Sequence, residues 1–240
     1  MLHLLRKQII SILILTFISQ IIHAQFEPNR PNHDEMPYYF GMSISYNHSY
    51  LHANGKHSKF LQDDSVLVAE PGASGGIGLG LLATMRLNAR FSLRLNPQLI
   101  IGGSKYFTYN LSKPGPGEYP TETKTLPSTI VSFPVQIKFN SDRIGNFRTF
   151  LMAGIKYDID LASNSAARNA DDLVKLKSSD FGYEAGIGFN FFLPFVTFSP
   201  ELKISNGITN VHSRDPNLKY SSALDKLNSR MIVFSIILED

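Results

Sequence analysis

The chain has 240 residues, a formal net charge of +3 and no cysteine. The absence of cysteine excludes a disulfide framework, a thiolate metal site and a cysteine nucleophile. Most of the excess positive charge comes from Arg6 and Lys7, because without these two the 23 basic residues become 21, against 20 acidic ones. The charge therefore gives no reason to expect nucleic acid as a partner.

The first 24 residues have the pattern of a secretory signal peptide. Arg6 and Lys7 form a positively charged start, an apolar stretch runs from Ile9 to Ile22, and Ala24 is the small residue before the expected cleavage site. Two polar residues interrupt the apolar stretch, which is short for a membrane helix of about 20 residues. We therefore expect residues 1–24 to be removed during export.

Residues 25–37 follow the expected cleavage site. They are mostly polar and contain Pro28, Pro31 and Pro37, and proline is unfavourable in the interior of helices and strands. We expect these residues to form a flexible periplasmic N-terminal arm. No linker, repeat or low-complexity segment divides the remainder, so residues 38–240 are predicted to be one domain.

From residue 38 onward, apolar residues recur at every second position. In the clearest segment, Phe147, Leu151 and Ile155 alternate with polar, charged or small residues. Alternating segments of about ten residues are the signature of a transmembrane β-barrel. Eight segments fit, although the last has apolar residues on both faces: 38–46, 76–87, 91–101, 131–139, 147–161, 181–191, 196–205 and 229–240. We predict an all-β, eight-stranded antiparallel up-and-down barrel in the outer membrane.

The links between these segments alternate in length. Short links fall at 88–90, 141–146 and 193–195, and long polar links at 52–72, 112–124, 162–178 and 212–226. Outer-membrane barrels have short periplasmic turns and longer extracellular loops, so an even strand number leaves both termini in the periplasm. Eight strands enclose a lumen that side chains fill, without an open pore.

A soluble β-sandwich or a lipocalin-like barrel is the alternative fold, with the apolar face turned inward. Opposite the apolar face, however, the sequence has glycine, serine and charges of both signs, which suit a narrow polar lumen. Aromatic residues near the segment ends also fit the girdles of a membrane barrel. Both features favour the membrane barrel.

Charged residues share the predicted lumenal face. Charges removed from water must pair, so we expect a structural ion-pair network that fills the barrel, and a solute pathway is the alternative. Asp158 and Asp160 lie along one face with Lys156, which indicates charge balance and not acid–base catalysis. The ten predicted members are Arg86, Arg94, Lys138, Arg148, Lys156, Asp158, Asp160, Glu184, Glu201 and Lys203.

Other candidate sites have simpler explanations. His48, His52 and His57 lie close together in the sequence, but without a second ligand pair we expect no metal site there. The glycines between residues 75 and 80 resemble a phosphate-binding loop, yet no helix follows them, so small lumen-facing residues explain them better. Serine-hydrolase, zinc-protease and Walker motifs are missing. We predict no enzymatic activity, no cofactor and no small-molecule substrate.

Three stretches carry a likeness beyond periodicity: Asn29–Met42 (NRPNHDEMPYYFGM), Lys156–Phe189, and Phe198–Asp240 with its SRDPN loop. They resemble the PorT family, also called SprT, of outer-membrane β-barrel proteins. The resemblance implies a component required by the type IX secretion system, which carries surface proteases and gliding adhesins across the outer membrane. It implies no catalytic residue. The chain ends in Leu238-Glu239-Asp240, without the terminal aromatic residue common in such barrels.

The resulting functional expectation is a non-enzymatic accessory of secretion, located in outer-membrane lipid and acting by contact with other secretion-system proteins. The arm is one candidate contact surface. The two most highly charged long links are another, with Arg168, Asp171, Asp172, Arg214 and Asp215 as candidate residues. Two alternatives remain open: a barrel that binds or transports a small apolar molecule, and a surface adhesin.

Overall fold

A computed structural model describes residues 28–56, 66–163, 174–214 and 218–240. The predicted signal peptide lies outside the described residues. None of the described helices is long and apolar enough to cross a membrane. The barrel wall consists of β1 (Tyr38–Lys56), β3 (Ser74–Arg86), β4 (Phe91–Leu95), β5 (Gln98–Gly102), β8 (Thr129–Asn140), β9 (Phe147–Asp160), β10 (Ser179–Phe192), β11 (Thr197–Gly207) and β12 (Leu224–Glu239).

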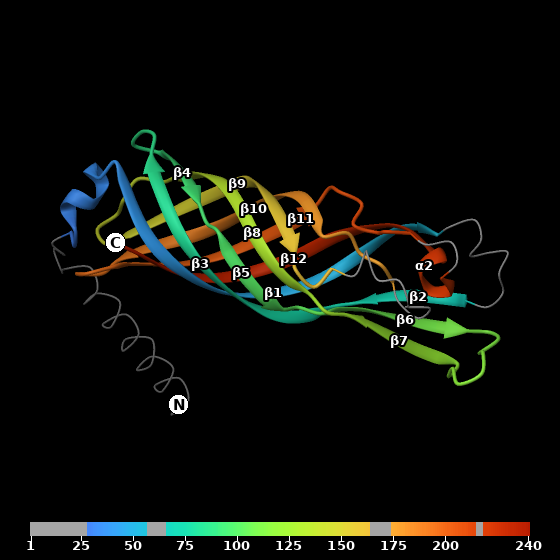
Figure 1. The fold of residues 1–240 in the computed structure, drawn as a ribbon. Helices are drawn as coiled ribbons and strands as arrows, with labels where there is room; N and C mark the ends of the chain where they lie inside the picture. Colours follow the sequence, from blue (N-terminus) through green and yellow to red (C-terminus); the bar gives the residue numbers. More distant parts are fainter. Residues whose placement is uncertain (1–27, 57–65, 164–173, 215–217) are drawn as a thin grey trace, which may run out of the picture.

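These strands form a closed antiparallel ring (Figure 1). Each strand pairs with its sequence neighbours, and β1 closes the ring because it pairs with both β3 and β12. The short strands β4 and β5 occupy one position in the ring, interrupted at Asn96 and Pro97. The ring therefore has eight strand positions, which confirms the predicted eight-stranded barrel.

The alternation of the sequence becomes an outer and an inner face. On β1, Tyr38, Phe40 and Met42 are each at least 60% exposed, whereas Ser43 and Ser45 are buried inside. The last strand begins earlier than predicted, at Leu224, and its inward apolar residues are buried in the barrel. Apolar residues on both of its faces are therefore compatible with a wall strand.

The barrel has two different ends. The short turns, the C-terminus and a 3-10 helix, η1 (Pro31–Glu35), gather at one end, which we name the turn end (Figure 1). The long links gather at the opposite end, which we name the loop end. Within the segment expected to be a flexible arm, η1 is ordered structure whose His33 is buried. Pro31 is compatible with this helix because it stands in the first turn, where an N–H lacks a partner anyway.

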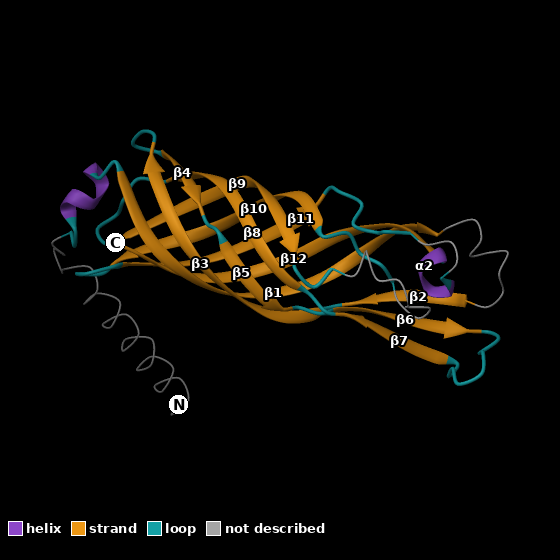
Figure 2. Ribbon diagram, in the orientation of Figure 1, coloured by secondary structure: helices purple, strands orange, loops and turns teal. Residues whose placement is uncertain are grey.

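The prediction of long polar links at the loop end is wrong for three of the four. Strands β2 (Val66–Gly72), β6 (Lys105–Leu111) and β7 (Thr121–Leu126) form a second antiparallel sheet that extends beyond the barrel (Figure 2). A short helix, α2 (Lys219–Ser222), lies in the last link. The expectation failed because these segments are short: β2 has seven residues, α2 has four, and β7 (TETKTL) has no apolar residue before Leu126.

Candidate functional site

A buried ion-pair cluster crosses the lumen in the half of the barrel nearer the turn end. Arg94 on β4 is fully buried, and its guanidinium binds the carboxylate of Glu201 on β11 and that of Glu239 on β12, the latter with Nη2 to Oε1 at 2.6 Å. The Nζ of Lys138 lies 4.0 Å from Oε2 of Glu239 and 3.9 Å from the centre of the Phe150 ring. We name Arg94, Lys138, Glu201 and Glu239 the central cluster. Because it joins strands from opposite sides of the ring, it closes the lumen.

A second group of polar side chains lies between the central cluster and the loop end. Lys156 binds Asp158 with Nζ to Oδ2 at 2.5 Å, and the hydroxyl of Ser132 donates to the other oxygen of Asp158 at 2.5 Å. Gln136 donates to the carboxylate of Glu184. Each of these charges therefore has a polar partner despite its burial, as the low dielectric of the lumen requires.

The predicted lumenal residues do not form one network. Arg86 contacts the helix η1 at the turn end, and Asp160 lies at the loop end, where it accepts a hydrogen bond from Ser128 at 2.9 Å. Lys203 is buried, but its ammonium group has no hydrogen-bond partner among the described residues. Eight of the ten are buried in the barrel: Arg94, Lys138, Arg148, Lys156, Asp158, Glu184, Glu201 and Lys203.

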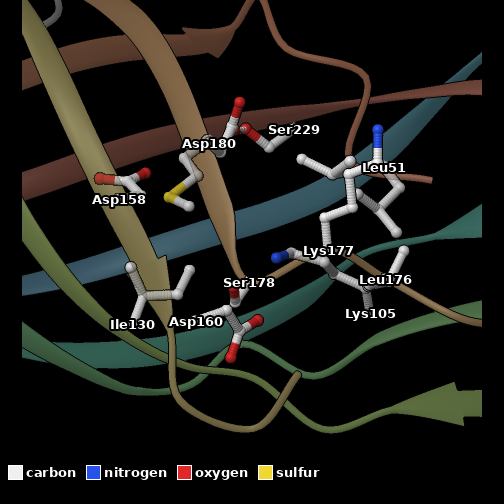
Figure 3. Close-up of a pocket in the computed structure, with 12 residues that line it drawn as sticks. Leu51, Lys105, Ile130, Asp158, Asp160, Leu176, Lys177, Ser178, Asp180 and Ser229 are labelled. Atoms are coloured by element: carbon white, nitrogen blue, oxygen red, sulfur yellow. Dashed lines mark hydrogen bonds between the residues drawn. The ribbon is translucent and has the colours of Figure 1, made fainter. Parts of the chain in front are cut away.

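A small cavity lies where the lumen meets the loop end (Figure 3). Its volume is about 30 Å³, and its lining includes Asp158, Asp160, Asp180 and Lys105 beside apolar side chains. One water needs about 10–15 Å³ of such volume, so the cavity of about 30 Å³ has room for about two or three waters. Among the described residues, no group of three or more acidic or histidine side chains is arranged to hold a metal ion. The cavity is too small for an organic ligand.

The turn end is closed by the helix η1. The ring of His33 packs edge-on against Tyr39 and Phe192, with ring centres 4.8 and 5.6 Å apart. The carboxylate of Asp34 lies 2.8 Å from Arg148 Nη1 on β9, 3.5 Å from Arg86 and 3.6 Å from Arg143. Burial opposes the ionisation of Asp34, but Arg148 and the other two arginines outweigh it and hold the pKa below its usual value.

The arginines also bind the backbone of this segment. Arg143 donates to the carbonyl oxygens of Asn29 and Arg30, and Arg86 donates to the carbonyl oxygen of Asp34. Arg30 in turn donates to the carbonyl oxygen of Glu239 at 3.1 Å and pairs with the Asp240 carboxylate at 3.2 Å. We name residues 29–35 the plug. Side chains from three separate parts of the chain hold it in the barrel mouth.

The plug is expected to loosen in acid because of His33. Burial, with help from the positive charge of Arg30, lowers the pKa of His33 to about 4, whereas a released histidine has a pKa of about 6.5. The docked plug is therefore fully favoured above about pH 6.5, and this contribution is lost as the pH falls towards 4. The hydrogen-exchange protection factors of residues 29–35, which are corrected for the intrinsic pH dependence of exchange, should decrease as the pH falls across this range.

A His33→Phe variant is the matched control, because it keeps the ring packing and removes the titration. Its protection factors in the plug should stay constant over the same range, since the pKa of Asp34 is already below its usual value. Equal pH dependence in the variant and the natural protein would contradict the assignment to His33.

The loop end contains a hydrophobic cluster that we name the cap. Phe107 and Tyr109 on β6 are fully buried, and Tyr109 packs against Tyr220 of α2 with ring centres 4.8 Å apart. The sequence indicates this cluster through the apolar residues Phe107, Tyr109 and Leu111, which recur at every second position along β6. The buried members are Leu51, Val66, Phe107, Tyr109, Leu111, Leu126, Val174, Leu176, Val211, Tyr220, Ala223, Leu224 and Leu227.

A polar tie fixes the tip of the β6–β7 hairpin to α2. The Glu118 carboxylate accepts hydrogen bonds from Lys219 Nζ and the Tyr220 hydroxyl, both at 2.7 Å. The bond from Lys219 and one from the Gly115 backbone lower the pKa of Glu118 to about 2. The hairpin is thereby held against the cap instead of projecting freely.

The remaining predicted residues are distributed as follows. Arg214 is exposed on the link between β11 and β12. His48 is exposed on the outer face of β1, away from the lumen. Gly76 and Gly78 face the lumen beside Asn47 and Ser45 of β1. Outside the described residues lie His57, Arg168, Asp171, Asp172 and Asp215.

Comparisons with known proteins agree with this architecture. The family model described as the outer membrane protein beta-barrel domain matches residues 24–213. No curated protein matches the chain.

Three solved structures illustrate the likeness. Neisserial surface protein A is 12% identical with a TM-score of 0.41, covering 82% of this chain and 95% of that one. OprG from Pseudomonas aeruginosa is 13% identical with a TM-score of 0.41, covering 83% and 94%. Ail of Yersinia pestis, solved with the heparin analogue sucrose octasulfate, is 10% identical with a TM-score of 0.38, covering 85% and 100%.

Proposed function

The chain belongs to the outer membrane protein beta-barrel domain family, and from that premise we propose that it is a non-enzymatic accessory of protein secretion. The observation that carries the proposal is the closed lumen. The Arg94 pairs with Glu201 and Glu239 lie across the barrel, and an eight-stranded ring has no space beside such side chains for a polypeptide. A barrel that cannot conduct its cargo acts through its two ends.

The system served is proposed to be the type IX secretion system, on the strength of the resemblance to the PorT family. The three stretches that carry the resemblance, Asn29–Met42, Lys156–Phe189 and Phe198–Asp240, include the whole plug and parts of the cap. A likeness that extends beyond the lipid-facing wall into both ends of the barrel supports a role for those ends.

The orientation follows from the link lengths. In outer-membrane barrels the short turns are periplasmic and the long loops extracellular. We therefore infer that the plug faces the periplasm and that the cap, with the sheet β2-β6-β7, faces the outside. One end is then available to periplasmic partners and the other to partners at the cell surface.

The outer edge of β7 is the best candidate for contact at the cell surface. Within the described part of the chain, β7 pairs only with β6. The Leu111 N–H donates to the Pro120 carbonyl, and in an antiparallel ladder every second residue of a strand bonds to the same neighbour. The backbone N–H and C=O groups of Thr121, Thr123 and Thr125 therefore point away from β6, to the open edge. An open edge of this kind accepts an extended polypeptide as an added strand.

The experiment for the contact surfaces is site-specific photocrosslinking in intact cells. A photoreactive residue at exposed Glu35 in the plug, or at Thr123 on β7, should give discrete crosslinks to other secretion proteins. The same residue at Leu151, which is 56% exposed on the lipid-facing wall, is the control and should give none. Absence of crosslinks from both Glu35 and Thr123 would contradict action by contact.

A conductance measurement separates this function from that of a transport barrel. The purified protein in a planar bilayer at neutral pH should show no steady ion current, because the central cluster and the plug close the lumen in series. A steady current would contradict the closed accessory and favour a solute pathway.

A further inference from the structure

The barrel wall has one interruption, between β4 and β5. β3 pairs with β4 through Ala83–Arg86 and with β5 through Gly76–Gly80, which leaves two residues of β3 between the two ladders. Pro97 in the interruption has no N–H to donate, although its carbonyl accepts the N–H of Leu81 at 3.0 Å.

A second proline, Pro134, removes a hydrogen bond from the ladder between the interruption and β8. The Asn96 N–H donates to the carbonyl of Pro134 on β8 at 3.3 Å, and Pro134 cannot donate in return. The wall around Asn96 and Pro97 therefore lacks cross-strand hydrogen bonds on both sides.

An apolar groove of about 510 Å³ lies on the outside of the wall at this interruption. Ser43, Gly80 and Gln98 also border the groove. The outward side chains that line the groove are Met42, Leu79, Leu81, Pro97, Leu99 and Val131. None of the lining residues is charged.

The groove lies at the level of the bilayer hydrocarbon. The outward residues of β1 from Tyr38 to Tyr46 are apolar or aromatic and more than half exposed, and Met42 is in the middle of this row, in register with Leu81 of β3. An apolar band of this kind faces lipid tails. The medium that meets the groove is therefore hydrocarbon.

We propose that this groove binds one acyl chain of a membrane phospholipid as an ordered ligand. The volume is within the range of about 300–1,000 Å³ typical of ligand sites, and the lining offers dispersion contacts without charge. A polar loop of a partner would leave its backbone groups unpaired in this environment, whereas a hydrocarbon chain has none. The bound chain fills the surface at the place where the strand ladder is interrupted between β4 and β5.

The test compares the lipid retained by the purified protein and by variants in native mass spectrometry after detergent exchange. Val131→Trp fills the groove. Val135→Trp is the matched control, because Val135 faces outward on the same strand and does not line the groove. The natural protein and the control should each keep one bound phospholipid, and Val131→Trp should lose it. Since the chain contains no other tryptophan, the fluorescence of each variant reports its folding directly.

Several outcomes would overturn the proposal. Equal phospholipid retention by all three proteins, or none by the natural protein, would exclude an ordered chain in the groove. Retention of a free fatty acid in place of phospholipid would exclude the assigned source. Should Val131→Trp fail to fold, Val131→Phe replaces it with the same expected loss. Added phospholipid should also raise the melting temperature of the natural protein and the control but not of the filled variant.

Discussion

Replacing Arg94 with alanine is expected to destabilise the barrel by about 3–5 kcal/mol, the cost of removing one partner from a buried ion pair. Arg94 is fully buried and is the shared partner of the Glu201 and Glu239 carboxylates. Without it, both carboxylates keep only the more distant Lys138 as a nearby cation in the central cluster. Urea-induced unfolding of the protein in lipid vesicles measures the loss.

Arg90 supplies the matched control for this substitution. It is four residues away in the same hairpin but pairs with Asp142 at the surface, where both side chains are more than half exposed. Such a pair contributes about 0–1 kcal/mol, so Arg90→Ala should unfold close to the natural protein. Equal destabilisation by the two substitutions would contradict the structural role of the central cluster.

Replacing Phe107 with alanine is expected to unfold the cap while the barrel persists. Truncation of a buried phenylalanine costs about 3–5 kcal/mol, and Phe107 has no exposed surface. Most cap residues lie outside the ring of paired strands, and Leu51, Leu224 and Leu227 lie in the loop-end extensions of β1 and β12. Loss of the cap should therefore leave the remaining wall ladders intact. Limited proteolysis should cut the β6–β7 hairpin rapidly, whereas the shift in gel mobility between boiled and unboiled samples should remain.

Tyr119→Ala is the control for the cap, since Tyr119 is in the same hairpin and 74% exposed. Its proteolysis pattern should match that of the natural protein. Loss of the mobility shift in Phe107→Ala would mean that the cap and the barrel fold as one unit, and would contradict a barrel that persists without the cap.

The wall of the barrel could be predicted from the sequence because lipid and lumen impose opposite demands on alternate residues. Leu151 and Ile155 face outward, and Met152 and Lys156, one residue further on, are buried. Successive side chains of a strand point to opposite faces whichever strands lie beside it, so the two faces can be read without knowledge of the strand pairing. The strand positions and the buried location of most predicted charges follow from this alternation.

The pairing of the charges could not be predicted in the same way. Whether Arg94 binds Glu201 or Glu184 depends on the tilt and stagger of the strands, which relate residues 107 positions apart in the sequence. The periodicity gives the face of each residue and not its height in the lumen. For this reason Arg86 and Asp160, which share the lumenal parity, lie at opposite ends.

The plug escaped prediction for a different reason. Its residues are polar and rich in proline, a composition typical of flexible segments, and its partners Arg86, Arg143 and Arg148 come from distant turns and strands. Order here arises from tertiary contacts to the backbone carbonyls. No local pattern in residues 29–35 reports those contacts.

The most direct test of the central claim is the export of a surface protease by the type IX secretion system, measured in cells that lack this barrel. Export to the cell surface should stop, and the natural chain should restore it. A chain with alanine at the charged plug residues Arg30 and Asp34 should reach the outer membrane but restore export poorly. Normal export in cells without the barrel would contradict the proposed function.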